Sequence, residues 1–227
     1  MRRETSVNTS YPRKIIDLLS ALCASPRDLV PYLRRLPCWG RQPADLELPW
    51  ITYGAIRKIE SFLTANSRVF EFGSGGSTFF FARRAACVTS IESDPVWYAH
   101  ITTLAQNRGL DNVDYRLEAM NDDSLDGYQQ HPFFRAVQKA TWDLILIDSF
   151  CGYRTGGSGG QLRPYAFSLS LAQLNPGGMI VVDDSWLYPE LLRPLRGWSI
   201  EDYVGVGPCR YGVSSTAIFC RHSNWSP

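Results

Sequence analysis

The sequence predicts an α/β fold: a doubly wound, mostly parallel sheet with an N-terminal helical cap and a C-terminal antiparallel hairpin. Three observations carry this prediction. From Arg68 onward, short apolar segments alternate with segments of helical periodicity, the pattern of parallel strands joined by crossover helices. The segment 142–148 is apolar enough for a central strand covered on both faces. Two short β segments, 203–206 and 215–220, follow each other with no helix between them, which favours a closing hairpin.

The N-terminal part has a different pattern. Apolar residues at helical spacing predict an amphipathic helix over 12–23, with Ile15 and Leu19 among its apolar positions, and a second helix over 53–63. Prolines punctuate the chain between these helices, which indicates short turns and irregular linkers. We therefore divide the chain into a helical cap, residues 1–67, and a main domain, residues 68–227.

The elements expected in the main domain follow in order along the chain. They are strands at 68–72, 88–92, 113–117, 142–148 and 179–182, helices at 77–85, 95–107 and 165–174, and a turn at 176–178.

The composition of the chain indicates which kinds of binding partner to expect. The 227 residues carry a formal net charge of +1, which gives no electrostatic reason to expect nucleic acid or an anionic membrane as a partner. No long apolar run follows the polar N-terminus, so we expect neither a secretory signal nor a membrane span. The six cysteines form no Cys-x-x-Cys pair, which favours reduced thiols in a cytoplasmic protein. The oligomeric state stays open, with a homodimer as one option.

A glycine-rich segment joins the first expected strand to the next helix. It reads Glu71-Phe72-Gly73-Ser74-Gly75-Gly76. Glycines there let the backbone approach a ligand closely, and the helix N-terminus offers free N–H groups. On its own this pattern is typical of every dinucleotide-binding protein.

Three residues refine that interpretation. A carboxylate at Glu71 would repel a pyrophosphate but attract the ammonium of an amino-acid moiety. Thr78 occupies the position where the NAD-binding motif has its third glycine. Glu92 ends the second expected strand, where a carboxylate accepts hydrogen bonds from ribose hydroxyls. Glu71 and Thr78 favour a nucleoside that carries an amino acid over NAD, whereas Glu92 suits either cofactor.

With these residues in view, a family resemblance becomes specific. The segment 69–78 resembles the first motif of the class I S-adenosylmethionine-dependent methyltransferases, in the form found in a bacterial group that reads Val-Leu-Glu-Phe-Gly-Ser-Gly-Gly-Ser-Thr. Segments 90–95, 174–184 and 215–219 resemble the ribose motif, the turn and strand after the substrate-side helix, and the final strand of that group. The resemblance spans roughly 49–221 and implies a Rossmann-like fold.

The resemblance also implies a cofactor, S-adenosyl-L-methionine, and residues that bind it. The glycine loop would pack against the methionine part, the acid after the second strand would hold the ribose, and the adenine contact would follow the third strand. The residues expected to bind the cofactor are Glu71, Gly73, Ser74, Gly75, Gly76, Glu92, Ser93, Ala119 and Asp148.

Three acids are expected on the acceptor side of the crevice. Asp148 ends the fourth strand, and Asp183 and Asp184 end the fifth, so all three should meet beyond the carboxyl ends of the strands. Oxygen ligands at this density suit Mg²⁺, which would lower the pKa of a bound hydroxyl. This arrangement is similar to cation-dependent O-methyltransferases. We expect Asp148 and Asp183 to be catalytic and all three acids to be metal ligands.

The same acids and the histidines also have explanations that involve no metal or catalysis. Asp148 could orient the acceptor without metal, and Asp184 with Ser185 could cap a helix that begins near Trp186. His100 and His131 are conceivable bases, although a lone histidine is more often a packing or surface residue.

Other residues are candidates for the walls of the site. Tyr153, Arg154 and Arg163 could bind an acceptor, and Trp50 with Tyr53 could close the opposite side. The glycine-rich segment 155–160 is a candidate lid within a segment, 151–161, that departs from the family pattern.

The sequence therefore predicts a methyltransferase acting on a small-molecule hydroxyl, sugar-like or phenol-like. Two alternatives stay open: an NAD-type oxidoreductase, and a cofactor-binding module without catalysis. The methyl acceptor itself is not predicted, because specificity belongs to loops and not to folds.

Overall fold

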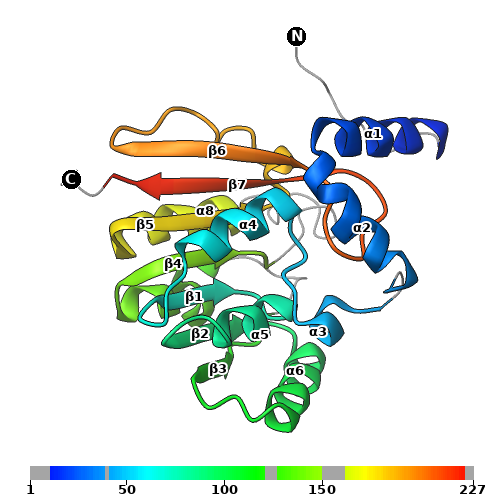
Figure 1. Cartoon of the computed structure of the whole chain (residues 1–227). Helices are drawn as coiled ribbons and strands as arrows, with labels where there is room; N and C mark the ends of the chain where they lie inside the picture. Colours follow the sequence, from blue (N-terminus) through cyan, green and yellow to red (C-terminus); the bar gives the residue numbers. More distant parts are fainter. Residues whose placement is uncertain (1–10, 39–40, 121–126, 150–161, 223–227) are drawn as a thin grey trace.

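The computed structural model describes residues 11–38, 41–120, 127–149 and 162–222. Its centre is a seven-stranded sheet with the order β3-β2-β1-β4-β5-β7-β6 (Figure 1). Five neighbouring strands, β3 to β5 in that order, run parallel, whereas β7 pairs antiparallel with both β5 and β6. The predicted α/β fold and the closing antiparallel pair are confirmed.

The strands agree closely with the apolar segments of the sequence. Their bounds are β1 Arg68–Phe72, β2 Cys87–Glu92, β3 Val113–Leu117, β4 Trp142–Ile147, β5 Leu174–Asp183, β6 Trp198–Gly205 and β7 Ser214–Arg221. Residues 144–147 of β4 are fully buried, as expected of a central strand with both faces covered.

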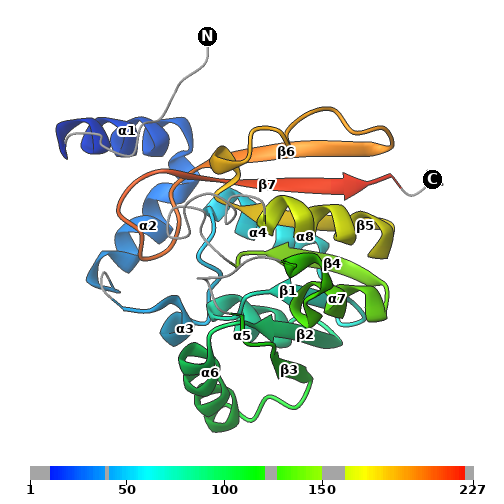
Figure 2. The same cartoon turned by 180° about the vertical axis from the view of Figure 1, so that it is seen from behind.

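Helices cover both faces of the sheet. On the face seen in Figure 1 lie α4 (Tyr53–Phe62) and α5 (Gly76–Ala82), while α7 (Pro132–Arg135) and α8 (Leu162–Ser170) cover the reverse face seen in Figure 2. The helix α6 (Pro95–Asn107) returns the chain from β2 to β3. Each helix layer buries its own core against the sheet, so the carboxyl ends of the parallel strands are held at one edge.

The predicted turn at 176–178 is wrong, because β5 continues through it. The register passes from Trp142 opposite Leu174 to Leu144 opposite Met179, so the extra residues form a bulge within the strand. A side chain at Gly178 would lie 2.7 Å from the main-chain oxygen of Asp143, so only glycine fits this close approach.

The N-terminal segment consists of α1 (Tyr11–Ala24), a 3-10 turn η1 (Pro26–Asp28), α2 (Leu29–Arg35), a second turn η2 (Leu36–Cys38), α3 (Pro43–Leu46) and α4. Ile59 of α4 packs in the same core as Val69 of β1. By contrast, Ile15 and Leu19 of α1 are exposed, although the periodicity alone would place them on the packed face. Among the described residues, no helix has the length and apolar character needed to cross a bilayer.

Candidate functional site

The glycine loop follows β1 at the carboxyl edge of the sheet, as predicted. Gly73 has a φ of +87° and donates its N–H to the oxygen of Ile91 over 2.8 Å. A Cβ at Gly73 would come within 3.2 Å of the main chain of Asp148 and Ser149. A Cβ at Gly75, in contrast, would meet nothing within 4 Å. The loop is therefore packed on its inner side and open to a ligand above Gly75.

Glu71 lies fully buried beneath this loop. The hydroxyl of Thr78 donates to its Oε1 and accepts the N–H of Gly75 over 3.0 Å. Thr78, which replaces the third glycine of the NAD motif, thus links the acid on β1 to the loop and to the start of α5. This role gives a physical reason for threonine at that position.

The second oxygen of Glu71, Oε2, is buried and has no hydrogen-bond partner within the described part of the chain. Burial raises the pKa of Glu71 to about 7, against the opposing effects of the Thr78, Ser90 and Ser77 hydroxyls. A buried carboxylate oxygen without a donor is costly, and an ammonium group brought by a ligand would satisfy it. The site therefore fits the amino-acid part of S-adenosylmethionine.

Glu92, at the end of β2, joins the same loop from the other side. Its Oε2 accepts the N–H of Ser74 over 3.0 Å and the Ser74 hydroxyl over 2.6 Å. Its Oε1 accepts the N–H groups of Ser93 and Asp94 at 2.8 and 3.0 Å. Every short bond of this carboxylate thus comes from the loop or from its own strand end, which fixes its position beside the loop. A ribose hydroxyl would have to displace the Ser74 hydroxyl from Oε2.

The segment after β3 lies next to Glu92. Glu118 donates its N–H to the oxygen of Glu92 over 2.8 Å, and Met120 donates to that of Ser93 over 3.2 Å. Ala119, between these two bonds, is exposed. The predicted adenine position is therefore adjacent to the predicted ribose position.

Two aromatic side chains that the sequence reasoning missed also hold the loop. The Tyr115 hydroxyl is 2.7 Å from the Ser74 hydroxyl, and the indole N–H of Trp97 donates to the oxygen of Ser74 over 2.8 Å. Tyr115 lies on β3 at the position opposite Ser90 of β2, so only a small side chain separates it from Glu71 on β1. Period-2 alternation along β3 is a signal that would have put Tyr115 on the same face as Glu71, but its reach across β2 depends on the small size of Ser90.

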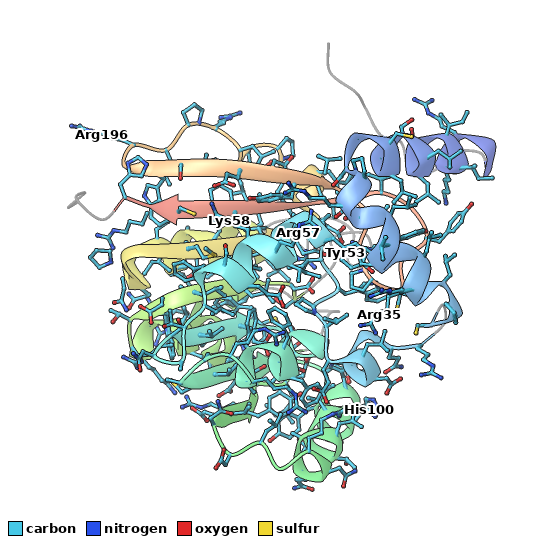
Figure 3. All side chains as sticks on the ribbon, in the orientation of Figure 1. Arg35, Tyr53, Arg57, Lys58, His100 and Arg196 are labelled. Carbon is cyan, nitrogen blue, oxygen red and sulfur yellow. The ribbon has the colours of Figure 1, made fainter. Side chains whose placement is uncertain are left out.

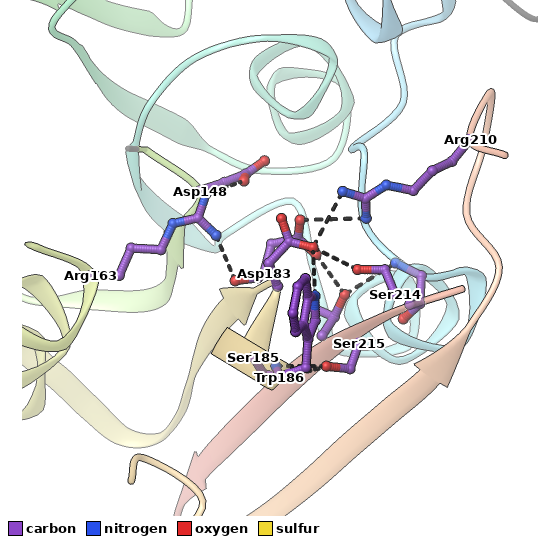
Figure 4. A network of polar contacts seen from close by, with 11 residues as sticks. Asp148, Arg163, Asp183, Ser185, Trp186, Arg210, Ser214 and Ser215 are labelled. Carbon is purple, nitrogen blue, oxygen red and sulfur yellow. Dashed lines mark hydrogen bonds and ion pairs between the residues drawn. The ribbon is translucent and has the colours of Figure 1, made fainter. Parts of the chain in front are cut away.

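The acids after β4 and β5 do come together (Figure 4), but arginines lie among them. Asp148, with 29% of its side chain exposed, accepts from the Nη2 of Arg163 over 3.2 Å. Arg163 is buried and also donates to the main-chain oxygens of Ser149 and Asp183, at 2.7 and 2.6 Å. Its donors are thus directed at the ends of β4 and β5, which gives it a different role from the acceptor binding that the sequence suggested.

Arg210 approaches the acids from the opposite side, from the loop between β6 and β7 (Figure 4). Its Nη2 is 3.3 Å from the Oδ1 of Asp184, and its Nη1 is 3.8 Å from the Oδ2 of Asp183. Asp183 is buried and accepts the Thr216 hydroxyl over 2.9 Å. Asp184 accepts the Ser214 hydroxyl over 2.7 Å. Both acids are therefore held by β7 and its preceding loop.

Burial raises the pKa of Asp183, and the neighbouring carboxylates of Asp148 and Asp184 raise it further. Burial also raises the pKa of Asp148, which Arg163 partly offsets. The two arginines supply the positive charge that three converging carboxylates need. Among the described residues, no group of three or more His, Cys, Asp and Glu side chains is arranged to hold a metal ion. The acids therefore do not fit the predicted Mg²⁺ site, because each of them already has an arginine within ion-pair distance.

The helix expected to begin near Trp186 is a single 3-10 turn, η7 (Ser185–Leu187). Asp184 precedes it with a φ of +50°, and its side chain does not cap the turn. Instead the Ser185 hydroxyl donates to Asp202 over 2.7 Å, and the N–H of Trp186 donates to the Ser215 hydroxyl over 2.9 Å. The capping explanation of Asp184 is wrong, and its carboxylate accepts instead from Arg210, from the Ser214 hydroxyl and from the indole N–H of Trp186.

The histidines lie outside this cluster. His100 is exposed on α6 beside Trp97 (Figure 3), and the Nδ1 of His131 accepts the N–H of Phe133 at the start of α7. Both match the packing or surface role. Tyr153, Arg154 and the expected lid within 151–161 lie outside the described residues.

Trp50, just before α4, and Tyr53, the first residue of α4, are the residues that we expected to close the other side of the site. Tyr53 donates its hydroxyl to the oxygen of Pro31 and its N–H to the oxygen of Val206, at 3.2 and 2.9 Å. The ring of Trp50 lies 5.6 Å from the guanidinium carbon of Arg210 and is 44% exposed. Tyr53 therefore holds α4 against α2 and the segment after β6, whereas Trp50 is partly exposed beside Arg210.

Comparisons with models of protein families and with curated protein sequences find no match. Comparisons with solved structures do. The O-methyltransferase TomG from Streptomyces achromogenes, solved with S-adenosylmethionine, has a TM-score of 0.53 and 16% identity, with 78% of this chain and 85% of that chain covered. An O-methyltransferase from Bacillus cereus, solved with S-adenosylhomocysteine, has a TM-score of 0.52 and 16% identity, covering 79% and 86%.

An rRNA methylase from Streptococcus thermophilus is similar to the same degree. Its TM-score is 0.53 and its identity 14%, with 75% of this chain and 95% of that chain covered. At these identities the comparisons show the fold alone, which is the Rossmann-like fold shared with these solved methyltransferases and implied by the sequence resemblance. Because the solved relatives act on different acceptors, the fold does not select the acceptor.

Proposed function

We propose that this protein is an S-adenosylmethionine-dependent methyltransferase that transfers a methyl group to a hydroxyl of a small molecule. The observation that carries the proposal is the arrangement of two acids around one glycine loop. Glu71 lies beneath the loop with an unpartnered buried oxygen, and Glu92 holds the loop through Ser74. A ligand that brings an ammonium at one end and ribose hydroxyls at the other satisfies both.

The residues that would hold this cofactor follow from that arrangement. Glu71 would accept from the ammonium, the backbone of the loop 73–76 would lie against the methionine chain, and Glu92 would accept from the ribose. Ser93 and Ala119 would border the adenine. When bound, the cofactor supplies a methyl group on a sulfonium, which needs alignment with a nucleophile more than it needs acid or base strength.

Asp148 would be the general base. Its carboxylate is partly exposed at the carboxyl edge, whereas that of Asp183 is buried. Burial raises the pKa of Asp148, so its carboxylate is a better proton acceptor than an exposed aspartate. Asp148 would accept the proton that the acceptor hydroxyl loses. Arg163 would orient Asp148, and Asp183 would act by holding Arg210.

The proposal includes no Mg²⁺, because the arginines fill the role that the sequence assigned to it. Arg163 and Arg210 bring two positive charges to Asp148, Asp183 and Asp184. Arg210 also lies against the ring of Trp50, where it could bind an electronegative oxygen of a sugar-like or phenol-like acceptor.

A small acceptor is favoured over nucleic acid because the chain carries a net charge of only +1. A cytoplasmic location is part of the proposal, since the five described cysteines, Cys23, Cys38, Cys87, Cys209 and Cys220, are free thiols.

The first experiment measures cofactor binding by calorimetry. We expect S-adenosylhomocysteine to bind with about micromolar affinity and NAD not to bind, and the Glu92→Ala variant to bind S-adenosylhomocysteine at least about tenfold more weakly. Asp111, exposed before β3, provides the control variant Asp111→Asn. Binding of NAD alone would overturn the proposal in favour of an oxidoreductase.

The second experiment measures release of S-adenosylhomocysteine with a panel of sugars and phenols. We expect turnover with at least one acceptor, and a loss of about 100-fold in kcat for Asp148→Asn with little change in cofactor binding. A cofactor that binds but never turns over, with no effect of Asp148→Asn, would instead indicate a non-catalytic binding module.

A further inference from the structure

The outer surface of the N-terminal helices is unusually apolar. Of the twelve large apolar side chains that are exposed among the described residues, six belong to α1 and α2. They include Ile16, which is 61% exposed, and Leu19, which is 57% exposed. The six side chains, which we call the N-terminal apolar surface, are Ile15, Ile16, Leu19, Leu29, Val30 and Leu33.

The helix α1 is two-sided, and only one side is used by the fold. Leu18, Ala21 and Leu22 pack against the core of the sheet, whereas Ile15 and Leu19, one turn apart, face outward. Figures 1 and 2 show α1 at the periphery of the molecule, next to the end of the edge strand β6. About half of the surface of Ile15 and Leu19 is therefore left in contact with solvent and is not used in the packing of this domain.

The charges around this surface are predominantly positive. Residues 13–35 carry five basic side chains, and none of them forms an ion pair within the described part of the chain: Arg13, Lys14, Arg27, Arg34 and Arg35. The acids of the same segment are Asp17, which is exposed, and Asp28, which is buried and paired with Arg57. The excess is local, because the whole chain is nearly neutral.

We propose that the outer faces of α1 and α2 bind the surface of an anionic lipid bilayer. An apolar stripe bordered by basic residues is the pattern of a helix that lies in the bilayer interface. The 14 residues of α1 extend over roughly 21 Å, which is too short to cross a hydrocarbon core of about 30 Å. A second copy of the chain is a poorer occupant, because two basic surfaces repel each other.

The N-terminal apolar surface lies on helices that are bonded to α4. Tyr53, the first residue of α4, bonds to Pro31 of α2, and Arg57 of α4 bonds to Asp28 of η1. Binding to a bilayer would therefore hold the carboxyl edge of the sheet close to lipid headgroups. If the proposed function is correct, the methyl acceptor would be presented at the membrane. The binding of the protein to the bilayer does not depend on the proposed function. This proposal revises the expectation, drawn from overall charge, that a membrane is no partner.

The test is co-sedimentation of the full chain with vesicles of phosphatidylcholine alone or mixed with phosphatidylglycerol. We expect binding only to the anionic vesicles, weakened by added salt. Leu19→Glu on α1 and Leu33→Glu on α2 should each lower the partition coefficient by about tenfold or more. Val96→Glu on α6 is the matched control, since Val96 is 80% exposed, and should bind as the parent does.

Thermal unfolding and binding of S-adenosylhomocysteine are measured for every variant. Absence of binding to anionic vesicles by the parent, or an equal loss in Val96→Glu and Leu19→Glu, would overturn the proposal. So would a stable dimer that Leu19→Glu dissociates, which would identify a second copy as the occupant. Vesicle binding by a protein that does not bind S-adenosylhomocysteine would support this inference and refute the proposed function.

Discussion

The guanidinium of Arg163 donates a hydrogen bond of 2.6 Å to the main-chain oxygen of Asp183, and this bond links α8 to the carboxyl end of β5. The same guanidinium donates to the oxygen of Ser149, just after β4, and to the carboxylate of Asp148. One buried side chain thus sets the separation of two neighbouring strand ends. The acids that the proposed chemistry uses take their positions from it.

Arg163→Met should therefore destabilise the fold as well as the site. It leaves two buried carbonyl oxygens without a donor and Asp148 without its partner, and such losses typically cost about 3–5 kcal/mol. Urea unfolding measures the change, with Arg196→Met as a control at an exposed position (Figure 3) that should change the free energy of unfolding by less than about 0.5 kcal/mol. Equal stability of the two variants would contradict the role assigned to Arg163.

Arg210 is predicted to make the site independent of metal. The parent enzyme should keep its activity in excess chelator and should not bind Mn²⁺, whereas Arg210→Met, which leaves Asp183 and Asp184 without their cation, should bind Mn²⁺ at least about tenfold more tightly. Calorimetry with Mn²⁺ measures the difference. Arg210→Lys keeps the charge and should bind the ion no better than the parent does.

Loss of methyl transfer by the parent in chelator, restored by Mg²⁺, would show that the arginines do not replace a metal. In that case the sequence expectation of a cation-dependent site would hold, and Asp183 would be a ligand instead of a support for Arg210.

The fold and the acid positions could be predicted because both depend on local patterns. The alternation of apolar strands and amphipathic helices determines the sheet, and the carboxyl ends of parallel strands meet at one edge, so Glu71, Glu92 and Asp148 could be located from their places in strands. The bulge in β5 could not be predicted, because Gly177 and Gly178 are equally typical of a turn. What distinguishes a bulge from a turn here is the main chain of β4, which lies 2.7 Å from the position of a Cβ at Gly178.

The partners of the acids could not be predicted either. Arg210 reaches Asp184 from a loop 26 residues later in the chain, and Thr216 reaches Asp183 from β7. A signal for them did exist: β7 runs antiparallel beside β5, so the loop before β7 must lie at the end of β5. The outward position of Ile15 and Leu19 could not be predicted from helical periodicity either. Periodicity identifies an apolar face of a helix but does not show what packs against that face.

The hydrogen bond between Ser74 and Glu92 leads us to predict that removal of a hydroxyl at the site does not weaken cofactor binding. Because the Ser74 hydroxyl occupies Oε2 of Glu92, a ribose hydroxyl must replace it. Ser74→Ala should then bind S-adenosylhomocysteine as tightly as the parent or up to about fivefold more tightly. The Ser74 N–H still donates to Glu92, so the loop should keep its position. Calorimetry measures the effect, and a clear loss of affinity would mean that the hydroxyl itself contacts the cofactor.

Glu71 should make the stability of the fold depend on pH. Its pKa is about 7 in the folded protein and 4.5 as the reference for an exposed glutamate, so the unfolded chain releases this proton first as pH rises. The contribution of Glu71 to stability is fully present below pH 4.5 and is lost as the pH rises through about 7. Relative to Glu71→Gln, the parent should lose up to about 3 kcal/mol over this range.

Cofactor binding should change with pH in the opposite direction, because an ammonium needs the ionised carboxylate of Glu71. The affinity of the parent for S-adenosylhomocysteine should rise by up to about tenfold between about pH 6 and pH 8. The reason is that Glu71 of the cofactor-free protein has a pKa of about 7 and ionises over this range. Glu71→Gln, which cannot ionise, should bind more weakly at pH 8 and show no such rise. Calorimetry at several pH values measures both proteins. If the affinities of the two proteins changed with pH in the same way, Glu71 would not contact the ammonium. The lack of a partner for Oε2 of Glu71 would then not indicate a ligand.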